Sequence, residues 1–381
     1  MPDPEVDVRA VWSDLCAVSP SPEVAERLRS DPRLGVRPRH PGLDDGTIVP
    51  PPSGMAEWAV PPRARLAGTV RLVVVLVEFP DQEMTHTAQH FNDLFFSLDV
   101  LPNGSVREYF REVSGGRVDL VGQTVGSFQL PQTLAWYANG NYGLGSPGEP
   151  GRAPDMARDT VAAADPAVDF ATYDNDGDGY VEGFVIVHAG PGGESTGNRG
   201  HIWSHKWALP SVYPADMTKV YGYLTVPEDA RVGVCAHELG HLLFGFPDLY
   251  DTDKTSEGLG DWCLMAAGSW GGQGDIPVHP SAWCKVSQGW VTVTNVTTDG
   301  RLSLPDVKSS GEVHRLWTDG LSGPEYFLLE NRQRTGFDQS LPDDGLLIWH
   351  VDESRPDNTD ENHYKVALLQ ADGYLKLTGQ P

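Results

Sequence analysis

The sequence contains no long apolar run. Its longest, residues 72–77, is far shorter than the roughly 18 to 20 residues that a membrane-spanning helix requires. Residues 1–5 also lack the basic head and the apolar stretch of a secretory signal. We therefore expect no transmembrane segment, and no export signal is visible.

Cysteine and basic residues are scarce as well. The four cysteines are too few for a disulfide scaffold and show no CxxC spacing for a zinc knuckle. Cys263 and Cys284 could pair across a loop of about twenty residues, and buried free thiols are the alternative. Lys and Arg number 28 against 53 Asp and Glu, and the resulting net charge of −25 would repel a phosphate backbone. Nucleic acid is therefore not an expected partner, whereas calcium would relieve the repulsion within acidic loops.

Several enzyme motifs are missing. The sequence has no GxSxG elbow, no local cysteine-protease signature and no phosphate loop that ends in Gly-Lys-Ser/Thr. These absences argue against the hydrolases and nucleotide-binding proteins that carry those motifs. A glycosidase with two carboxylates stays open on composition alone, but it would leave the histidine motif described below unexplained.

The pattern of apolar residues indicates an α/β (α+β) protein. Residues 1–68 combine one short helical pattern with Pro-rich stretches, which is typical of a leader or prosegment. The first buried strand is rich in β-branched residues, and helices and strands alternate after it. We expect strands at 70–79, 118–121 and 184–188, helices at 105–113, 153–164 and 232–244, and a β-rich C-terminal part that includes 326–329 and 346–350.

The strongest chemical signal is the sequence HELGH at residues 237–241. On a helix, residues four apart lie on one face, so His237 and His241 can present two imidazoles to one ion. Glu238 projects beside that ion, within reach of a water that the ion activates. Zinc lowers the pKa of this water and polarises the scissile carbonyl, while Glu238 takes the proton and returns it to the leaving amine. The motif therefore predicts a zinc hydrolase.

A catalytic zinc takes a third protein ligand and keeps one open position. Gly245 is placed to end the helix, and Asp248 follows in a turn that can bring its carboxylate back to the ion. We expect Asp248 to be the third ligand, with Asp251 and Glu257 as alternatives. Cys16, in the leader, could occupy the open position as a thiolate and hold a zymogen inactive, and an inert thiol is the alternative.

A second candidate metal site lies in the Asp- and Gly-rich loop 174–182. The candidate calcium ligands are Asp174, Asp176, Asp178, Tyr180 and Glu182. They occupy positions one, three, five, seven and nine of a calcium loop, with a glycine at position six. Position twelve is Val185 in place of glutamate, so the loop is not an EF-hand and another segment would have to supply oxygens. An ordinary Asp/Gly-rich turn is the alternative.

Several segments resemble the immune inhibitor A family of metallopeptidases, peptidase family M6. The resemblance is carried by HELGHLLFGFPDLYDTD from residue 237, GDWCLMAAGSWGG from 260 and HPSAWCKVSQGWV from 279, with further similarity at 73–81, 174–179, 202–205 and 345–352. The family usually reads HExxHxxGxxD. Here Gly245 and Asp248 come eight and eleven residues after His237, as though Phe244 were inserted.

This resemblance implies a metzincin-like zinc-peptidase domain with two zinc histidines, an acidic third ligand, a general-base glutamate and structural calcium. It gives Met265 the role of the Met-turn, a hydrophobic floor beneath the metal; by itself, a Met among small apolar residues indicates core packing. It also implies an exported, extracellular protein. We expect a leader or prosegment in 1–68, a zinc-metallopeptidase catalytic domain in 69–300 and a β-rich part packed on it in 301–381.

The expected function is that of a zinc-dependent endopeptidase that hydrolyses protein or peptide substrates. Two alternatives stay open. A calcium-stabilised adhesive or binding module with a non-catalytic zinc site would bind calcium without proteolysis, although a structural zinc site has no need of Glu238. A zinc aminopeptidase would use Glu257 in place of Asp248.

Overall fold

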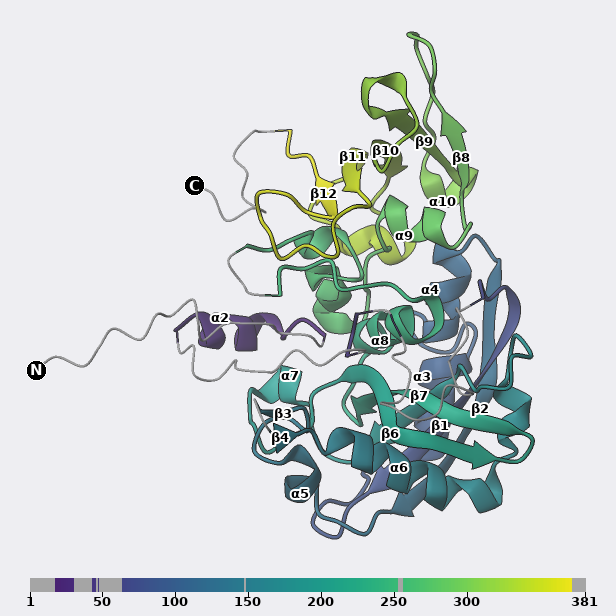
Figure 1. Ribbon diagram of the computed structural model, residues 1–381, viewed down its shortest axis with the longest axis vertical. Coiled ribbons are helices and arrows are strands. Elements are labelled where there is room, and N and C mark those ends of the chain that lie inside the picture. Colours follow the sequence, from purple (N-terminus) through teal and green to yellow (C-terminus); the bar gives the residue numbers. More distant parts are fainter. Residues whose placement is uncertain are drawn as a thin grey trace, which may run out of the picture.

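The computed structural model describes residues 18–30, 43–45, 47, 64–146, 149–252 and 256–371. Within them lie two five-stranded sheets and the helices that pack on them (Figure 1). Among these residues no helix is long and apolar enough to cross a membrane. Cys16 lies outside the described residues.

The first sheet has the strand order β2-β1-β5-β7-β6. Its strands are β1 (Gly68–Glu78), β2 (Val118–Gln129), β5 (Phe184–His188), β6 (His205–Ala215) and β7 (Thr218–Pro227). The strands β2, β1, β5 and β7 run parallel, and β6 closes the sheet as an antiparallel edge strand. The apolar run within β1 is buried on both faces, as is usual for a parallel strand that has helices on both sides.

Alternate residues of β1 belong to two different hydrophobic cores. Val73, Val75 and Val77 pack with α5 (Leu134–Ala138) and α6 (Ala153–Ala164). Leu72, Val74 and Leu76 face the opposite core, which contains α3 (Ala88–Phe96), α4 (Val106–Val113) and α8 (Val232–Phe244). This alternation follows from the two-residue period of a strand. The α/β prediction is confirmed.

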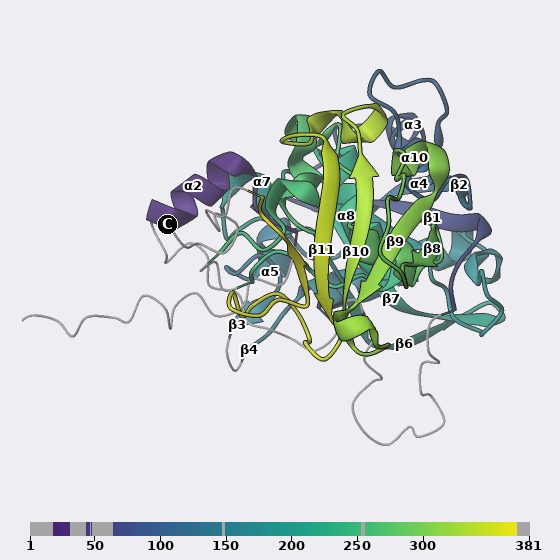
Figure 2. The same ribbon diagram turned by 90° about the horizontal axis from the view of Figure 1, so that it is seen from above.

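The second sheet has the order β12-β11-β10-β9-β8 (Figure 2). Its strands are β8 (Thr292–Asn295), β9 (Glu312–Trp317), β10 (Glu325–Arg332), β11 (Gly345–Asp352) and β12 (Val366–Leu368). The pairs are antiparallel except for β8 and β9, which are parallel. In β10, buried and partly buried residues alternate strictly, so one face packs inward.

Buried ion pairs join this second sheet to the preceding segments. Lys285 of α9 (Ala282–Ser287) lies 2.5 Å from a carboxylate oxygen of Glu330. Arg332 forms an ion pair with Asp338 and donates a 2.7 Å hydrogen bond to the carbonyl of Trp262. All four charged side chains are buried. The contacts hold β10 against the segment that follows α8, which places the second sheet next to that helix.

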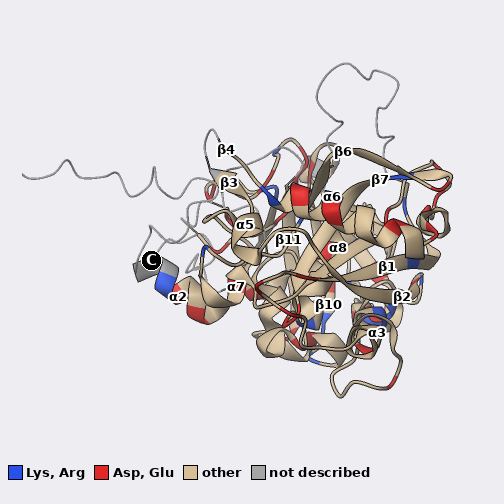
Figure 3. Ribbon diagram, turned by 90° about the horizontal axis from the view of Figure 1, so that it is seen from below, with Lys and Arg blue, Asp and Glu red and all other residues tan. Residues whose placement is uncertain are grey.

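The remaining elements are short. They are α2 (Pro22–Ser30), α7 (Gly193–Thr196), α10 (Val307–Ser310), the strands β3 (Gly145–Ser146) and β4 (Glu149–Pro150), and the 3₁₀ turns η2 (Asp165–Ala167), η3 (Phe170–Tyr173), η4 (Gly260–Trp262), η5 (Ala267–Gly274), η6 (Thr318–Gly320) and η7 (Gly336–Ser340). Acidic residues are spread over helices and loops (Figure 3). Cys263 and Cys284 are buried free thiols, so the disulfide considered from the sequence is not formed.

Candidate metal centre

The helix α8 lies between the two sheets, and all 13 of its residues are buried (Figure 1). Two glycines allow this close packing. A Cβ on Gly233 would lie 1.8 Å from the carbonyl oxygen of Ser269, and one on Gly240 would lie 2.7 Å from the sulfur of Met265. The helix ends at Gly245, whose φ of 65° suits glycine and whose N–H bonds back to the last turn. The chain then turns towards the histidine face.

His237 and His241 face each other from successive turns of α8. Their Nε2 atoms are 3.1 Å apart, and both side chains are fully buried. The Nδ1 atom of His237 lies 2.9 Å from the carbonyl of Leu264, and that of His241 lies 2.5 Å from the carbonyl of Phe246. Because a carbonyl only accepts, each Nδ1 atom donates to its carbonyl, which leaves the two Nε2 atoms directed towards each other. Two imidazole nitrogens at this distance can both be ligands of one cation.

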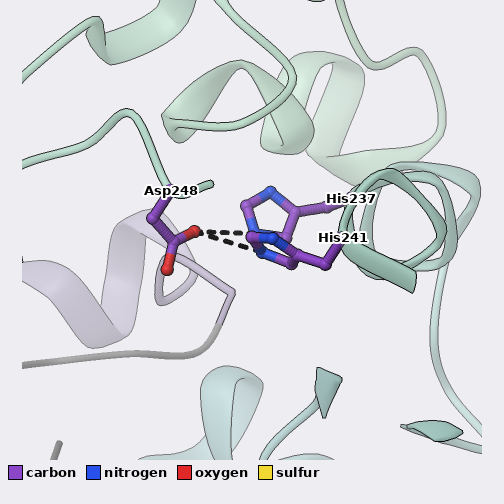
Figure 4. A group of neighbouring side chains, drawn as sticks. All are labelled: His237, His241 and Asp248. Carbon is purple, nitrogen blue, oxygen red and sulfur yellow. Dashed lines mark hydrogen bonds and ion pairs between the residues drawn. The ribbon is translucent and has the colours of Figure 1, made fainter. Parts of the chain in front are cut away.

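Asp248 completes the cluster (Figure 4). Its Oδ1 atom lies 3.2 Å from Nε2 of His237 and 3.3 Å from Nε2 of His241. The side chain is only 5% exposed, and within the described part of the chain neither carboxylate oxygen receives a hydrogen bond. Burial raises the pKa of Asp248, but His241 and His237 lower it by more, so the net shift is downward. A buried anion without a donor is costly, and a bound cation would offset that cost.

Phe244, the residue that lengthens the spacing from His237 to Asp248 relative to the family motif, is part of the helix. It is the last residue of α8, is 4% exposed and packs against the rings of Phe110 and Trp290. The helix therefore absorbs the extra residue, and Asp248 still reaches the imidazoles. The two alternative ligands lie elsewhere: Asp251 accepts hydrogen bonds from the backbone and hydroxyl of Ser256, and Glu257 is exposed.

Glu238 lies next to the imidazole cluster. It is fully buried, and neither of its carboxylate oxygens has a hydrogen-bond partner among the described residues. Burial raises its pKa well above the ordinary value, and the charges of Asp44 and Asp248 raise it further. Beneath α8, Met265 is buried against Gly240, and its carbonyl accepts a 2.8 Å hydrogen bond from Leu249, which follows Asp248. The Met265 segment thus supports both the helix and the loop that carries Asp248.

Two buried carboxylates near this cluster have no motif in the sequence. Glu194, in α7, accepts hydrogen bonds of 2.6 Å and 3.0 Å from the hydroxyl and backbone of Ser204. Asp44 belongs to the N-terminal region. Its carboxylate lies near the carboxylate of Glu238 and the imidazole of His241. Its only signal in the sequence is an Asp-Asp-Gly triplet, which also occurs in ordinary turns.

The loop 174–182 gathers four of its five candidate calcium ligands. Oxygens of Asp174, Asp176, Asp178 and Glu182 lie within 4.8 Å of one another. Glu182 is buried, and its burial raises its pKa to about 7. The same loop makes turn hydrogen bonds, such as those from Gly177 and Gly179 to Asp174. The ring of Tyr180 lies beneath the ammonium of Lys219. Both the calcium loop and the ordinary turn fit these contacts.

The chain is similar in sequence to known proteins. The family model described as immune inhibitor A peptidase M6, catalytic domain, matches residues 66–294. The chain is 31% identical over 277 residues to the pre-pro-metalloprotease PrtV of Vibrio cholerae, a match that covers 57% of this chain and 29% of that protein. It is 29% identical over 254 residues to immune inhibitor A of Bacillus thuringiensis subsp. alesti, covering 53% of this chain and 37% of that protein.

Both relatives are much longer than the matched region, since the matches cover 29% and 37% of their lengths. The matched residues 66–294 include the first sheet, α8 and the cluster of His237, His241 and Asp248. The prediction of the family from its motifs is confirmed. The chain belongs to the immune inhibitor A family of metallopeptidases, peptidase family M6, and contains the family's catalytic domain.

Proposed function

We propose that this chain is a zinc-dependent endopeptidase in which His237, His241 and Asp248 hold the metal. The observation that carries the proposal is the buried pair of imidazoles, whose Nε2 atoms face each other 3.1 Å apart beside a carboxylate. Two neutral nitrogens and one carboxylate oxygen form a ligand set that suits zinc and leaves a position for substrate. The family name, a metallopeptidase, agrees with this chemistry.

The residues fit a zinc ion on physical grounds. The carbonyls of Leu264 and Phe246 fix the tautomer of both imidazoles, which is the second-shell arrangement typical of zinc histidines. The oxygens of Asp248 receive no hydrogen bond within the described ranges, so they remain available to a cation. When bound, zinc would supply a Lewis acid that polarises the scissile carbonyl and lowers the pKa of water.

Glu238 is the proposed general base. Its carboxylate lies beside His241, and its burial raises its affinity for a proton. A base of this kind takes a proton from the attacking water and returns it to the leaving amine. Its environment holds the carboxyl without any hydrogen-bond donor from the described residues, so the group is not committed to a structural role.

The other predictions remain proposals. We infer that residues 1–68 act as a prosegment, that 69–300 form the catalytic domain and that 301–381 form a β-rich part packed on it. Calcium in the loop 174–182 stays a prediction, because the grouping of its four carboxylates also fits an ordinary turn. An extracellular location stays a prediction. The aminopeptidase alternative lacks support, because Glu257 is exposed and lies outside the cluster.

The test compares wild type with Glu238→Gln in a casein-cleavage assay after activation, with metal content measured in the same samples. We expect the substitution to reduce cleavage by at least about a hundredfold, in line with the contribution of a general base, while zinc stays bound. A chelator should abolish wild-type activity, and added zinc should restore it. Normal cleavage by zinc-loaded Glu238→Gln, purified free of other proteases, would refute the proposed mechanism.

A further inference from the structure

A short N-terminal stretch, residues 43–45 and 47, lies against the edge strand β6. The N–H of Asp44 donates a 3.1 Å hydrogen bond to the carbonyl of Lys206, and Oδ1 of Asp44 accepts a 2.6 Å bond from the N–H of Lys206. The ammonium of Lys206 donates to the carbonyl of Thr47 and lies 3.8 Å from a carboxylate oxygen of Asp45. One residue of the edge strand therefore fixes the whole stretch.

This anchoring directs the Asp44 side chain into the metal centre. The residue is 1% exposed, and its second oxygen, Oδ2, receives no hydrogen bond from the described part of the chain. The carboxylate contributes an oxygen to a cluster with Glu238 and His241 whose candidate ligand atoms all lie within 4.8 Å of one another. A third buried carboxylate beside Glu238 and Asp248 is unfavourable unless a cation or a proton is shared among them.

A second N-terminal stretch, residues 18–30, contacts Trp203, Trp270 and α7. The carbonyls of Val18 and Ser19 accept hydrogen bonds of 2.9 Å and 2.6 Å from the indoles of Trp203 and Trp270. Trp203 lies just before β6, and Trp270 lies beyond Met265. Farther along, α2 packs beside α7, where Ser21 donates to the carbonyl of Glu194 (Figure 1). Residues 18–30 are thus held by Trp203, Trp270 and α7.

We propose that Asp44 is an additional metal ligand, supplied by the N-terminal region, which fills the position that substrate would take and holds the peptidase latent. This inference rests on the proposed function, because it needs a metal at His237, His241 and Asp248. It assigns the blocking group to a carboxylate that the structure places at the site. The thiol of Cys16, considered from the sequence for the same role, lies outside the described residues.

Bound Asp44 would block both the attacking water and an extended substrate. While Asp44 is bound, Glu238 has a carboxylate beside it where the attacking water would have to stand. The backbone groups of Lys206 are also occupied by Asp44, although an extended substrate could pair with an edge strand there. Release of residues 43–45 and 47 would therefore open both the metal position and the strand edge in one step.

The experiment uses the full chain with Glu238→Gln, so that the leader is not cleaved, and cobalt(II) in place of zinc. Asp44→Ala and Asp44→Asn are compared with the parent and with Asp45→Ala, a control at the neighbouring, partly exposed residue. The readouts are the visible absorption of cobalt(II) and the dissociation constant of a peptide hydroxamate. Asp44→Asn retains an oxygen for the Lys206 N–H, so it covers the case in which Asp44→Ala does not fold.

We expect both Asp44 variants to change the cobalt spectrum and Asp45→Ala to leave it unchanged. If Asp44 occupies the site at least about 90% of the time, its removal should tighten hydroxamate binding about tenfold or more. In chains with intact Glu238, Asp44→Ala should also raise peptide cleavage before any processing. Folded Asp44 variants with the parent's spectrum and affinity would overturn the inference, as would the same changes produced by Cys16→Ala alone.

The role of Asp44 as a metal ligand and the peptidase activity are tested separately by these experiments. A changed spectrum in the Asp44 variants, without peptide cleavage by any chain, would support the ligand and refute the peptidase activity. Peptide cleavage that depends on Glu238, with a spectrum insensitive to Asp44, would support the peptidase and refute the latency contact. Cobalt binding that is unaffected by His241→Ala would overturn both, because the metal would then lie elsewhere.

Discussion

Replacing Phe244 by Ala tests whether the helix end positions the third ligand. The ring is 4% exposed and lies 4.9 Å from Trp290, 5.1 Å from Phe110 and 5.8 Å from Phe246, measured between ring centroids. Truncation of a buried Phe costs about 3–5 kcal/mol, which includes about 0.5–1.5 kcal/mol for each aromatic pair that is lost. Because Phe244 makes three aromatic contacts, we expect Phe244→Ala to lower the free energy of unfolding by an amount near the upper end of that range. Phe244→Leu keeps most of the volume and should cost about 1.5 kcal/mol.

The assay is thermal and urea unfolding of the metal-free protein, because a bound metal would itself raise the apparent stability. We expect Phe244→Ala to lower Tm by about 5 °C or more. Zinc affinity should fall as well, since Phe246 accepts the hydrogen bond from His241 and Asp248 follows two residues later. Phe170→Ala is the matched control: that ring is buried in the other core, so stability should fall while zinc affinity is retained.

The reasoning would be refuted if Phe244→Ala unfolded within about 1 kcal/mol of wild type, since a tightly packed ring cannot be removed so cheaply. A loss of stability with unchanged zinc affinity would show a narrower error. In that case Phe244 would be a core residue only, and the loop with Asp248 would hold its position without the helix end.

Three further predictions concern other parts of the molecule. Asp338→Ala should destabilise by about 3–5 kcal/mol in urea unfolding, because it removes the nearer of the two carboxylates that pair with the buried guanidinium of Arg332; a cost below about 1 kcal/mol would contradict this. Burial raises the pKa of Asp338 but Arg332 lowers it by more, so in wild type this stabilisation is present above about pH 4 and is lost as the pH falls. Gly233→Ala should cost about 3 kcal/mol, because its Cβ meets the backbone carbonyl of Ser269 at 1.8 Å; an unchanged Tm would show that the helix can move. Calcium should raise Tm in wild type and not in Asp176→Ala, and a wild type that does not respond would favour the ordinary turn.

The core of the fold could be predicted because its signals are local. The β-branched run of β1 indicates a buried strand, and the apolar sequence around HELGH indicates the buried helix α8. The helix end was also predictable, since Gly245 adopts the left-handed conformation that glycine favours. The strand at 118–121 proved longer than predicted. It continues to Gln129 because β1 goes on pairing with it, although residues 122–129 are mostly polar or glycine.

The features that could not be predicted depend on contacts between distant positions. Asp44 and Lys206 are 162 residues apart, and the hydrogen bonds of Asp44 to the edge strand β6 place its carboxylate near Glu238 and His241. Likewise, Lys285 and Glu330 are separated by 45 residues and read as solvent-exposed charges in a one-dimensional pattern. From the sequence, Cys16 in the leader could be a blocking group, with an inert thiol as the alternative, because a thiolate is a familiar metal ligand. An aspartate in an Asp-Asp-Gly turn carries no comparable signal.

The most direct test of the central claim is a crystal structure of the zinc-loaded protein with anomalous diffraction at the zinc edge. The account predicts a strong peak within bonding distance of Nε2 of His237, Nε2 of His241 and a carboxylate oxygen of Asp248, about 2.0–2.2 Å from each. A peak that excludes Asp248 and includes Glu257 would contradict the ligand set. The lack of any peak at the two histidines in zinc-loaded crystals would contradict the metal centre itself.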